Sequence, residues 1–281
     1  MTAQAFNAAE YAEKWGVPED AITRLNQMRE RKLATSDLSV DELLLVRQAG
    51  FRPLGFVMGA SVYRVPSYRY GNLGNMELTD YTQATYNMRQ SALQRMEAEA
   101  LLLGADGVVG VRFELLYSQF YTNGWEFMAY GTAVKADEAA ATYPEVTWRN
   151  NKGLPFTSDL SGQAFWKLMQ AGYIPCGFVM GNSVYHIGYQ SWGGMLKRRN
   201  SIAEIPEYTQ GIYFARELAM ERMHTEAEAL GAEVVAEFKL TQHGHGWDSH
   251  IMEFLSVGTA ARALRADHHI AAPNMVVSLD Q

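Results

Sequence analysis

Two segments of the chain carry the same helical pattern of apolar and small side chains. The first has Tyr81, Thr85, Met88, Ala92, Met96, Ala100 and Leu103, and the second has Tyr208, Ile212, Ala215, Ala219, Met223, Ala227 and Leu230. Steps of three and four residues place each set on one face of a helix. The alanines in the middle predict close packing against a sheet, and Gly104 and Gly231 predict left-handed caps at the helix ends.

A strand precedes each long helix and two more strands follow it. The pattern of the first strand is Gly-Phe-Val-Met-Gly, which begins at Gly55 and again at Gly177. We expect the strand of the first unit to span residues 54–63. The last two strands of that unit meet at Asn-Gly (123–124), a hairpin signature because both residues tolerate positive φ. The second unit has a looser stretch there, residues 243–248.

The two units are repeats of one sequence. Residues 36–63 and 158–185 share Ser-Asp-Leu-Ser, Gln-Ala-Gly and Gly-Phe-Val-Met-Gly at an offset of 122, and the long helices and later strands repeat at an offset of 127. The second unit therefore has five more residues before its long helix. A short helix opens each unit, because Ser39 and Glu42 form a capping-box pattern and Gly50 supplies a stop. The predicted fold class is α+β, with two tandem β-α-β-β units.

The predicted domain boundaries follow from these repeats. They are a helical extension at 1–35, the first repeat at 36–136, a linker at 137–157, the second repeat at 158–263 and a tail at 264–281. A three-stranded sheet with one principal helix leaves its strand edges and one sheet face exposed unless a neighbour covers them. Successive apolar residues such as Phe56-Val57 also favour burial on both sheet faces. We expect the repeats, or separate chains, to pair.

Composition and charge narrow the class of protein. The chain has 281 residues, 48% of them hydrophobic and 20% charged, and a formal net charge of −7. This composition excludes a disordered or fibrous chain and argues against a general nucleic-acid binder. Cys176 is the only cysteine, so no disulfide can form within the chain. The sequence has no signal-peptide pattern and no apolar run of about 18 residues, so we expect a soluble, cytoplasmic protein.

The repeats resemble the YbjQ family of small bacterial proteins. The resemblance rests on Gly55–Gly59, on the Ala-rich helix that ends in Leu-Gly-Ala-Asp, on Val-Val-Gly-Val at 108–111 and on Gly-Thr-Ala-Val at 131–134. The second repeat departs from this pattern, with Val-Val-Ala-Glu at 234–237. The resemblance implies a dodecin-like fold, assembly into five-membered rings and a heavy-metal-binding role.

Two units per chain constrain such a ring. Five units cannot come from whole chains, so either five chains form two layers of five units, or the ring number differs, or some repeats face outwards. We expect a homo-oligomer of five chains with ten units.

The heavy-metal-binding role requires ligands. The predicted metal site consists of His243, His245, Asp248 and His250, which would hold a divalent cation. The alternative is a polar hairpin tip, because the first repeat has no histidine in the corresponding stretch. Cys176 replaces Leu54 and is expected to pack as a small apolar residue.

Further candidates lie on strands, loops and the N-terminal helix. Residues expected to face a ligand or the interior of a ring are Ser61, Tyr63, Ser183 and Tyr185; residues expected to contact a protein partner are Tyr68, Arg69, Tyr70, Trp192, Lys197, Arg198 and Arg199. The alternative for the serines and tyrosines is a structural role in the strand and its interfaces. The helix that begins near Pro18 offers another partner surface or caps the first repeat.

No pattern predicts catalysis. There is no arrangement of nucleophile, base and orienting group, and Glu99 and Glu226 are expected at solvated helix ends. The preferred hypothesis is a non-catalytic ring or cage protein with a structural or binding role. The alternatives are a metal or small-ligand sensor and an enzyme at a cleft between units.

Overall fold

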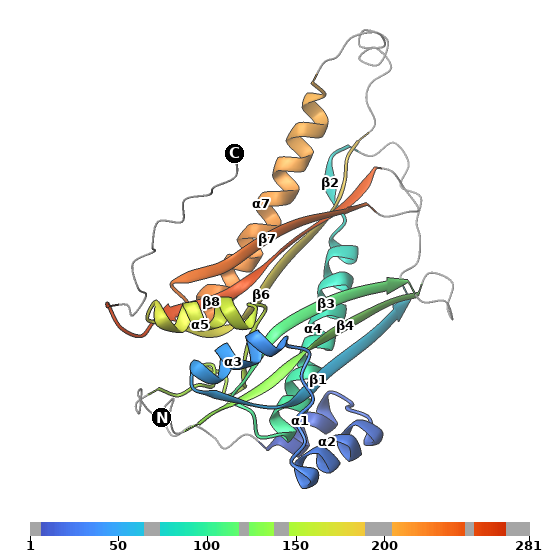
Figure 1. Cartoon of the computed structure of the whole chain (residues 1–281). Helices are drawn as coiled ribbons and strands as arrows, with labels where there is room; N and C mark the ends of the chain where they lie inside the picture. Colours follow the sequence, from blue (N-terminus) through green and yellow to red (C-terminus); the bar gives the residue numbers. More distant parts are fainter. Residues whose placement is uncertain are drawn as a thin grey trace, which may run out of the picture.

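The computed structural model describes residues 7–64, 74–117, 124–137, 146–188, 204–244 and 250–267. They form an α+β fold with two four-stranded sheets, one for each repeat. The prediction of two tandem units of the same type is confirmed (Figure 1). Among the described residues, no helix is long and apolar enough to cross a membrane.

The helices and strands occur in the order that the sequence predicts, apart from two short strands described below. The first repeat contains α3 (Val40–Gln48), β1 (Phe51–Arg64), α4 (Thr79–Leu102), β3 (Gly107–Tyr117) and β4 (Gly124–Ala136). The second contains α5 (Gly162–Gln170), β6 (Tyr173–His186), α7 (Pro206–Ala229), β7 (Val234–Gly244) and β8 (Ile251–Ala263). Before the repeats lie α1 (Ala8–Lys14) and α2 (Glu19–Arg31). Strand β1 is longer than predicted because its pairing with β4 continues to both ends of β4.

The predicted helix ends are confirmed. Ser39 and Glu42 form both hydrogen bonds of a capping box at the start of α3. Gly50 follows α3 with φ +88°, and Gly104 and Gly231 follow the long helices with φ +74° and +71°. These are left-handed values that glycine adopts without a steric penalty.

The long helices lie close against their sheets, as the alanine stripes predict. A Cβ atom on Gly59 would overlap the carbonyl oxygen of Ala92 in α4, and one on Gly181 would overlap that of Ala219 in α7. Both alanines are fully buried. The glycines in the first strand and the alanines in the helix therefore act as one packing unit in each repeat.

Two short strands cross between the repeats. Strand β2 (Met76–Glu77) leaves the first repeat and pairs antiparallel with β6 of the second. Strand β5 (Phe156–Ser158) leads into the second repeat and pairs parallel with β3 of the first. The sheet orders are therefore β1-β4-β3-β5 and β2-β6-β8-β7. Sequence patterns did not indicate these strands, because β2 contains only two residues and β5 only three.

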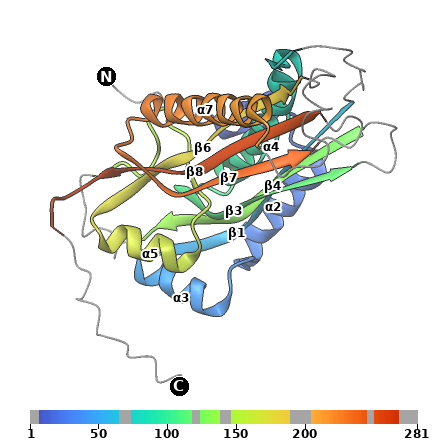
Figure 2. The ribbon, with the colours of Figure 1, turned by 90° about the horizontal axis from the view of Figure 1, so that it is seen from above.

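The layers of the molecule can be followed in Figures 1 and 2. Helix α7 covers one face of the second sheet, and α4 lies between the other face of that sheet and the first sheet. One apolar cluster joins the layers, because Met88 of α4 packs with Val57 of β1 and with Met180 of β6. The predicted pairing between repeats is thus made within one chain.

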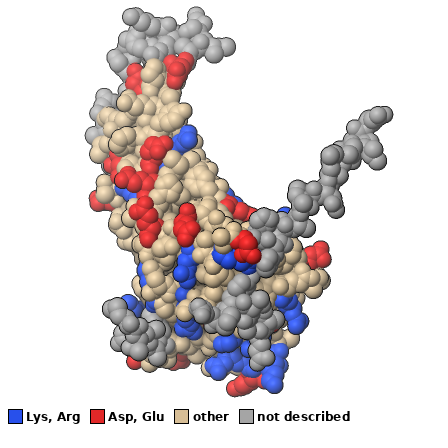
Figure 3. Space-filling view, turned by 90° about the vertical axis from the view of Figure 1, so that its left-hand side faces the viewer, with Lys and Arg blue, Asp and Glu red and all other residues tan. Residues whose placement is uncertain are grey.

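Charge is unevenly distributed over the surface. On the face shown in Figure 3, acidic side chains gather mainly in the upper half and basic side chains mainly in the lower half. The upper half contains α7, which carries the exposed residues Glu207, Glu217, Glu221 and Glu228. The lower half contains α2, which carries the exposed residues Arg29 and Arg31.

A bulge interrupts the strand that follows the long helix in each repeat, the second of its three main strands. In β3 it falls between Val109 and Arg112, where Gly110 has φ +70°. In β7 the same irregularity falls after Ala236, where Glu237 has φ +49°. The departure from the family pattern seen in the sequence therefore places a glutamate where the backbone favours glycine.

Replacing Glu237 with glycine is expected to stabilise the protein. The left-handed conformation costs a non-glycine residue about 1–2 kcal/mol, of which the greater freedom of glycine in the unfolded chain cancels about 0.4–1 kcal/mol. Urea unfolding measures the difference. Glu233→Gly is the matched control, because Glu233 has no positive φ, and that variant is expected to be destabilised. A loss of stability in both variants would contradict the explanation.

Candidate functional site

A buried ion pair joins the two repeats. The guanidinium Nη1 of Arg89 in α4 lies 2.6 Å from the carboxylate Oε1 of Glu253 in β8. Their side chains are only 2% and 1% exposed. Arg89 also lies over the ring of Phe127 in its own sheet, 4.7 Å from the ring centre. Because burial removes both charges from water, each partner depends on the other.

Polar side chains continue this contact towards β6. The Asn182 side-chain amide donates to Glu253 Oε1 at 3.2 Å and to Thr85 Oγ1 at 2.6 Å. It also donates to the carbonyl oxygen of Thr82 at 3.1 Å. The hydroxyl of Thr82 in turn accepts from the backbone N–H of Val184 at 2.9 Å. These bonds fix the position of α4 along the second sheet.

A second group of contacts closes the free edge of β6. The Tyr86 hydroxyl donates to Glu226 of α7, and Glu226 accepts from the backbone N–H of Met180 at 2.8 Å. Burial raises the pKa of both Tyr86 and Glu226. Nearby, Arg222 bonds Glu77 of β2 at 2.6 Å. Despite its partial burial, Glu77 has a lowered pKa, chiefly because Arg222 and Thr82 donate hydrogen bonds to its carboxylate.

A cavity of about 220 Å³ lies between the repeats and contains a fully buried carboxyl group, that of Glu97. Burial raises the pKa of Glu97 to about 7, although Lys152 and a hydrogen bond from Tyr11 oppose the rise. The Tyr11 hydroxyl lies 3.4 Å from Glu97 Oε2. Burial and the neighbouring Glu97 also raise the pKa of Tyr11. This cavity can hold a proton near neutral pH.

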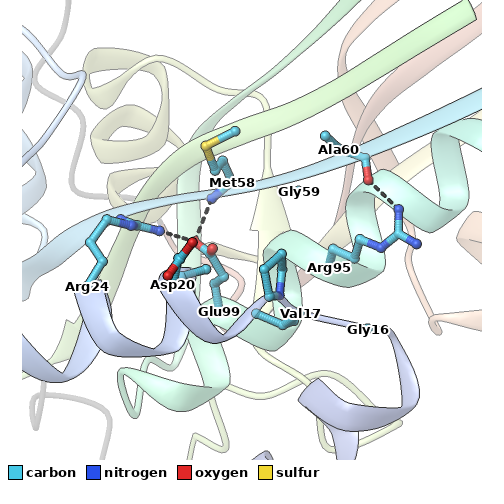
Figure 4. A pocket seen from close by; sticks show the side chains of 11 residues that line it. Gly16, Val17, Asp20, Arg24, Met58, Gly59, Ala60, Arg95 and Glu99 are labelled. Atoms are coloured by element: carbon cyan, nitrogen blue, oxygen red, sulfur yellow. Dashed lines mark hydrogen bonds and ion pairs between the residues drawn. The ribbon is translucent and has the colours of Figure 1, made fainter.

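A larger open groove, of about 530 Å³, lies between α2 and the free edge of β1. Figure 4 shows Glu99 at its centre, between Arg24 and the backbone of Met58. Arg24 Nη2 lies 2.6 Å from Glu99 Oε2, and the Met58 N–H donates to the same oxygen at 3.0 Å. Burial raises the pKa of Glu99, and these two donors limit the rise. The groove is mostly apolar, and its central carboxylate is already hydrogen-bonded.

The prediction of solvated ends for Glu99 and Glu226 is wrong. Glu99 is buried, and Glu226 is only partly exposed. Each reaches around the edge strand of its own sheet and accepts a backbone N–H there. The signal that could have revealed them was their identity at equivalent positions of both helices.

The strand serines and tyrosines occupy structural positions. Ser61 is buried and donates to the carbonyl oxygen of Met88 at 2.7 Å, and Ser183 is fully buried. The Tyr63 hydroxyl lies 3.4 Å from Ser91 Oγ. The Tyr185 ring is buried, with its centre 6.0 Å from that of Phe214. In this single chain, neither serine reaches a solvent-filled space.

The predicted metal site is only partly described. His243 is exposed on β7, and His250 Nδ1 lies 2.9 Å from the Tyr208 hydroxyl and 3.2 Å from the Ile187 carbonyl oxygen. His245 and Asp248 lie outside the described residues. Within the described ranges, no group of three or more His, Cys, Asp or Glu side chains could hold a metal ion. Cys176 packs in an apolar cluster, as expected.

The candidate partner loops also lie outside the described residues. They are Tyr68, Arg69, Tyr70, Trp192, Lys197, Arg198 and Arg199. Helix α2 is described and contributes Leu25 to the main core and Arg24 to the groove. Sequence reasoning identified this helix but missed the chemistry of Arg24.

Removing one partner of the ion pair is expected to destabilise the protein strongly. Arg89→Met leaves the Glu253 carboxylate buried without its cation, at a cost of about 3–5 kcal/mol. Arg89→Met combined with Glu253→Leu is expected to cost much less than the sum of the two single changes. Urea unfolding of all three variants measures this coupling. Lys239→Met is the control at an ion pair whose lysine side chain is 53% exposed, where about 0–1 kcal/mol is expected. If the losses in the free energy of unfolding from the two single changes add up to the loss in the double variant, the assigned pairing of Arg89 with Glu253 is wrong.

Glu97→Gln tests the buried carboxyl group. Its folded pKa of about 7 exceeds its ordinary value of 4.5, so the folded chain holds more protons than the unfolded chain between these values. The contribution of Glu97 to stability therefore falls as pH rises through this window. Relative to wild type, the variant should melt higher at pH 8 than at pH 5, by about 2–4 °C for each kcal/mol.

Thermal melts from pH 5 to pH 8 measure this difference, with Glu10→Gln as the control, because Glu10 is exposed. A wild-type and variant difference that is the same at both pH values would show that Glu97 does not titrate in this window.

Both repeats are similar in sequence to known proteins. The sequence profile of the YbjQ family, described as "Putative heavy-metal-binding", matches residues 55–137 and 175–263. An encapsulin nanocompartment protein of Mycobacterium tuberculosis is 41% identical over 249 residues, which cover 89% of this chain and 93% of that protein. A UPF0145 protein of Methanococcus maripaludis is 39% identical over 90 residues, 30% of this chain and 78% of its own.

A second UPF0145 protein, from Halorubrum lacusprofundi, is 47% identical over 64 residues, 23% of this chain and 60% of its own. These shorter relatives match less than a third of the chain, whereas the mycobacterial protein matches most of both repeats. The chain belongs to the YbjQ family, with two tandem copies of the family unit.

Proposed function

We propose that this protein is a non-catalytic structural component that self-associates into a ring or cage. The observation that carries this proposal is the unequal burial of the two long helices. Helix α4 is covered on two sides, by its own sheet and by β6. Among the described residues, helix α7 is covered on one side only, and its Tyr213 residue is 57% exposed beside the exposed Phe214.

No described helix covers the outer face of the first sheet where exposed Val62 and Leu116 lie. A second copy of the chain offers a surface that can cover α7 and another that can cover the outer face of the first sheet. Large exposed apolar patches on soluble proteins are typical of interaction sites. We expect five chains with ten units, located in the cytoplasm.

The mycobacterial relative supports this role, because its name describes it as an encapsulin nanocompartment protein. Its similarity extends over 89% of the chain. We infer the same kind of participation in a larger protein assembly for this chain. The candidate partner loops and α2 are the proposed contacts with further protein partners.

Metal or small-ligand binding is the second candidate function. The family description favours a metal, and the proposed ligands remain His243, His245, Asp248 and His250. The strand residues Ser61, Tyr63, Ser183 and Tyr185 would face a ligand only after rearrangement or at the interior of a ring. An enzyme at a cleft between units is the third candidate, and the cavity of about 220 Å³ at Glu97 lies between the two repeats.

Native mass spectrometry with elemental analysis of freshly purified protein tests these alternatives together. The expected result is a mass of about five times 31.5 kDa without bound metal. A single-chain mass at micromolar concentration would overturn the structural proposal. A single-chain mass with one metal ion per chain would favour the second candidate instead.

A further inference from the structure

The contact between the two repeats within one chain has two sides, and each side recurs on the outside of the molecule. The first repeat supplies α4, the edge of β3 and α3, and the second supplies the inner face of β6 and β8, strand β5 and α5. We call the outward copy of the first side the head surface and the outward copy of the second side the tail surface. The head surface comprises Glu204, Ile205, Tyr213, Arg216, Val234 and Phe238, and the tail surface comprises Leu33, Val62, Tyr63, Leu116 and Glu126.

The tail surface repeats a row of residues that is buried in the second sheet. Glu126 pairs with Val62 on one side and with Leu116 on the other. Its counterpart Glu253 pairs with Val184 and is fully buried against Arg89. Val184 is completely covered by α4, whereas Val62 is 55% exposed. Within the part of the chain that the structure describes, the first sheet thus presents the same row without a helix over it.

The head surface carries the matching helix. Arg216 of α7 occupies the position of Arg89, 127 residues later, and is half-buried. Its guanidinium lies 5.2 Å from the ring centre of Tyr213. Ile205 occupies the position of Leu78, whose N–H donates to the carbonyl oxygen of Val184 at 2.8 Å. The charge of Arg216 is therefore opposite to that of Glu126 in the open row, and both residues stand at the positions of a buried ion pair.

The edge of β7 carries a second matching feature. In the first repeat, β5 pairs with the edge of β3, and Phe156 packs over Gly107. In the second repeat, the corresponding edge begins at Val234, which is 41% exposed and lines an open groove of about 400 Å³ beside α7. The counterpart of β5, 122 residues earlier, is the segment 34–36, which forms no helix or strand and follows Leu33, itself 63% exposed. Among the described residues, the edge of β7 and the segment 34–36 are thus each left without the partner that their counterparts have.

We propose that the head surface of one chain binds the tail surface of a second copy in the geometry of the contact between repeats. Arg216 then pairs with Glu126, and segment 34–36 pairs parallel with residues 234–236. Glu204 lies opposite Tyr63, as Glu77 lies opposite Tyr185 within the chain. This proposal rests on the proposed self-association and specifies which surfaces make it.

The contact between repeats within one chain and the proposed contact between two copies differ at one carboxylate. Within the chain, Tyr86 donates to Glu226. On the tail surface, Arg24 of α2 already binds the corresponding Glu99. Tyr213 therefore gains no bond to Glu99 while α2 stays in place, and the contact between copies uses the part of the β1 edge beyond α2.

Such a contact is heterologous, since the two surfaces differ. Repeated head-to-tail contacts close a ring when the rotation between copies divides a full turn. First and second repeats then alternate around one ring instead of forming two layers. The acidic upper half and basic lower half in Figure 3 fit an arrangement in which opposite ends meet.

A pair of cysteines tests the register of this contact. Directly opposed residues of antiparallel strands have Cα atoms about 4.5–5.5 Å apart, which suits a disulfide. Glu204→Cys combined with Tyr63→Cys is expected to give covalent dimers and longer ladders under mild oxidation. They should appear on a non-reducing gel and collapse to single chains with a reducing agent. Cys176 is buried and does not provide a surface thiol.

Glu204→Cys with Glu10→Cys is the matched control, because Glu10 is exposed but lies outside the tail surface, and we expect no ladder from it. If wild type has the mass of several chains but the test pair gives no ladder, or no more than the control, the proposed register is wrong while self-association stands. If wild type has the mass of one chain and no ladder forms, the proposed function fails as well.

Charge reversal of the proposed pair, Arg216 with Glu126, provides the second arm of this experiment. Arg216→Glu or Glu126→Arg alone is expected to weaken association at least about tenfold. Both changes in one chain are expected to restore it, because the opposed charges are exchanged. Unaltered thermal melts at low protein concentration show that each variant folds. Equal association in all variants, or loss without restoration in the double variant, would overturn the pairing.

Discussion

The rest of the structure depends on a single constraint: a sheet of three main strands with one helix is too thin to bury its own apolar surface. Each unit has apolar side chains on the second face of its sheet, and only another unit can cover them. The chain meets this constraint once, by placing α4 between two sheets. The buried Arg89–Glu253 pair then determines how far the helix can slide, since a shift would leave either charge without its partner.

Buried carboxylates in this protein have structural partners. Glu99 and Glu226 accept backbone N–H groups of edge strands, and Glu253 accepts from Arg89. This arrangement protects strand edges that would otherwise pair with other chains. Glu97 differs, because its main hydrogen-bond donor is a tyrosine and its pKa lies near 7. It links the stability of the contact between repeats to the acidity of the solution.

Much of the fold could be predicted from the sequence because local rules and tertiary packing agree. Ser39 and Glu42 at a helix start, and Gly104 and Gly231 at helix ends, act through backbone geometry alone. The repeat itself also revealed the two-unit organisation. Strands β2 and β5 were missed because two or three residues carry no readable periodicity and form only through pairing with the other repeat.

Of the candidate site, less was predictable. Glu99 and Glu226 look like ordinary surface glutamates in a helical pattern, and only the path of the edge strand shows why they are buried. The ion pair joins residues 164 positions apart, so no spacing rule could connect them.

The exchange of β2 and β5 also sets an order for folding during synthesis. The ribosome releases α4 before β6, which ends at His186, 84 residues after Leu102. At about 5–20 residues per second, the outer side of α4 stays uncovered for roughly 4–17 seconds. During that interval, the nascent first repeat presents the same apolar helix face that α7 presents in the finished chain. A neighbouring nascent chain could occupy this face first. Slower translation therefore favours association between chains over the covering of α4 by β6 of its own chain.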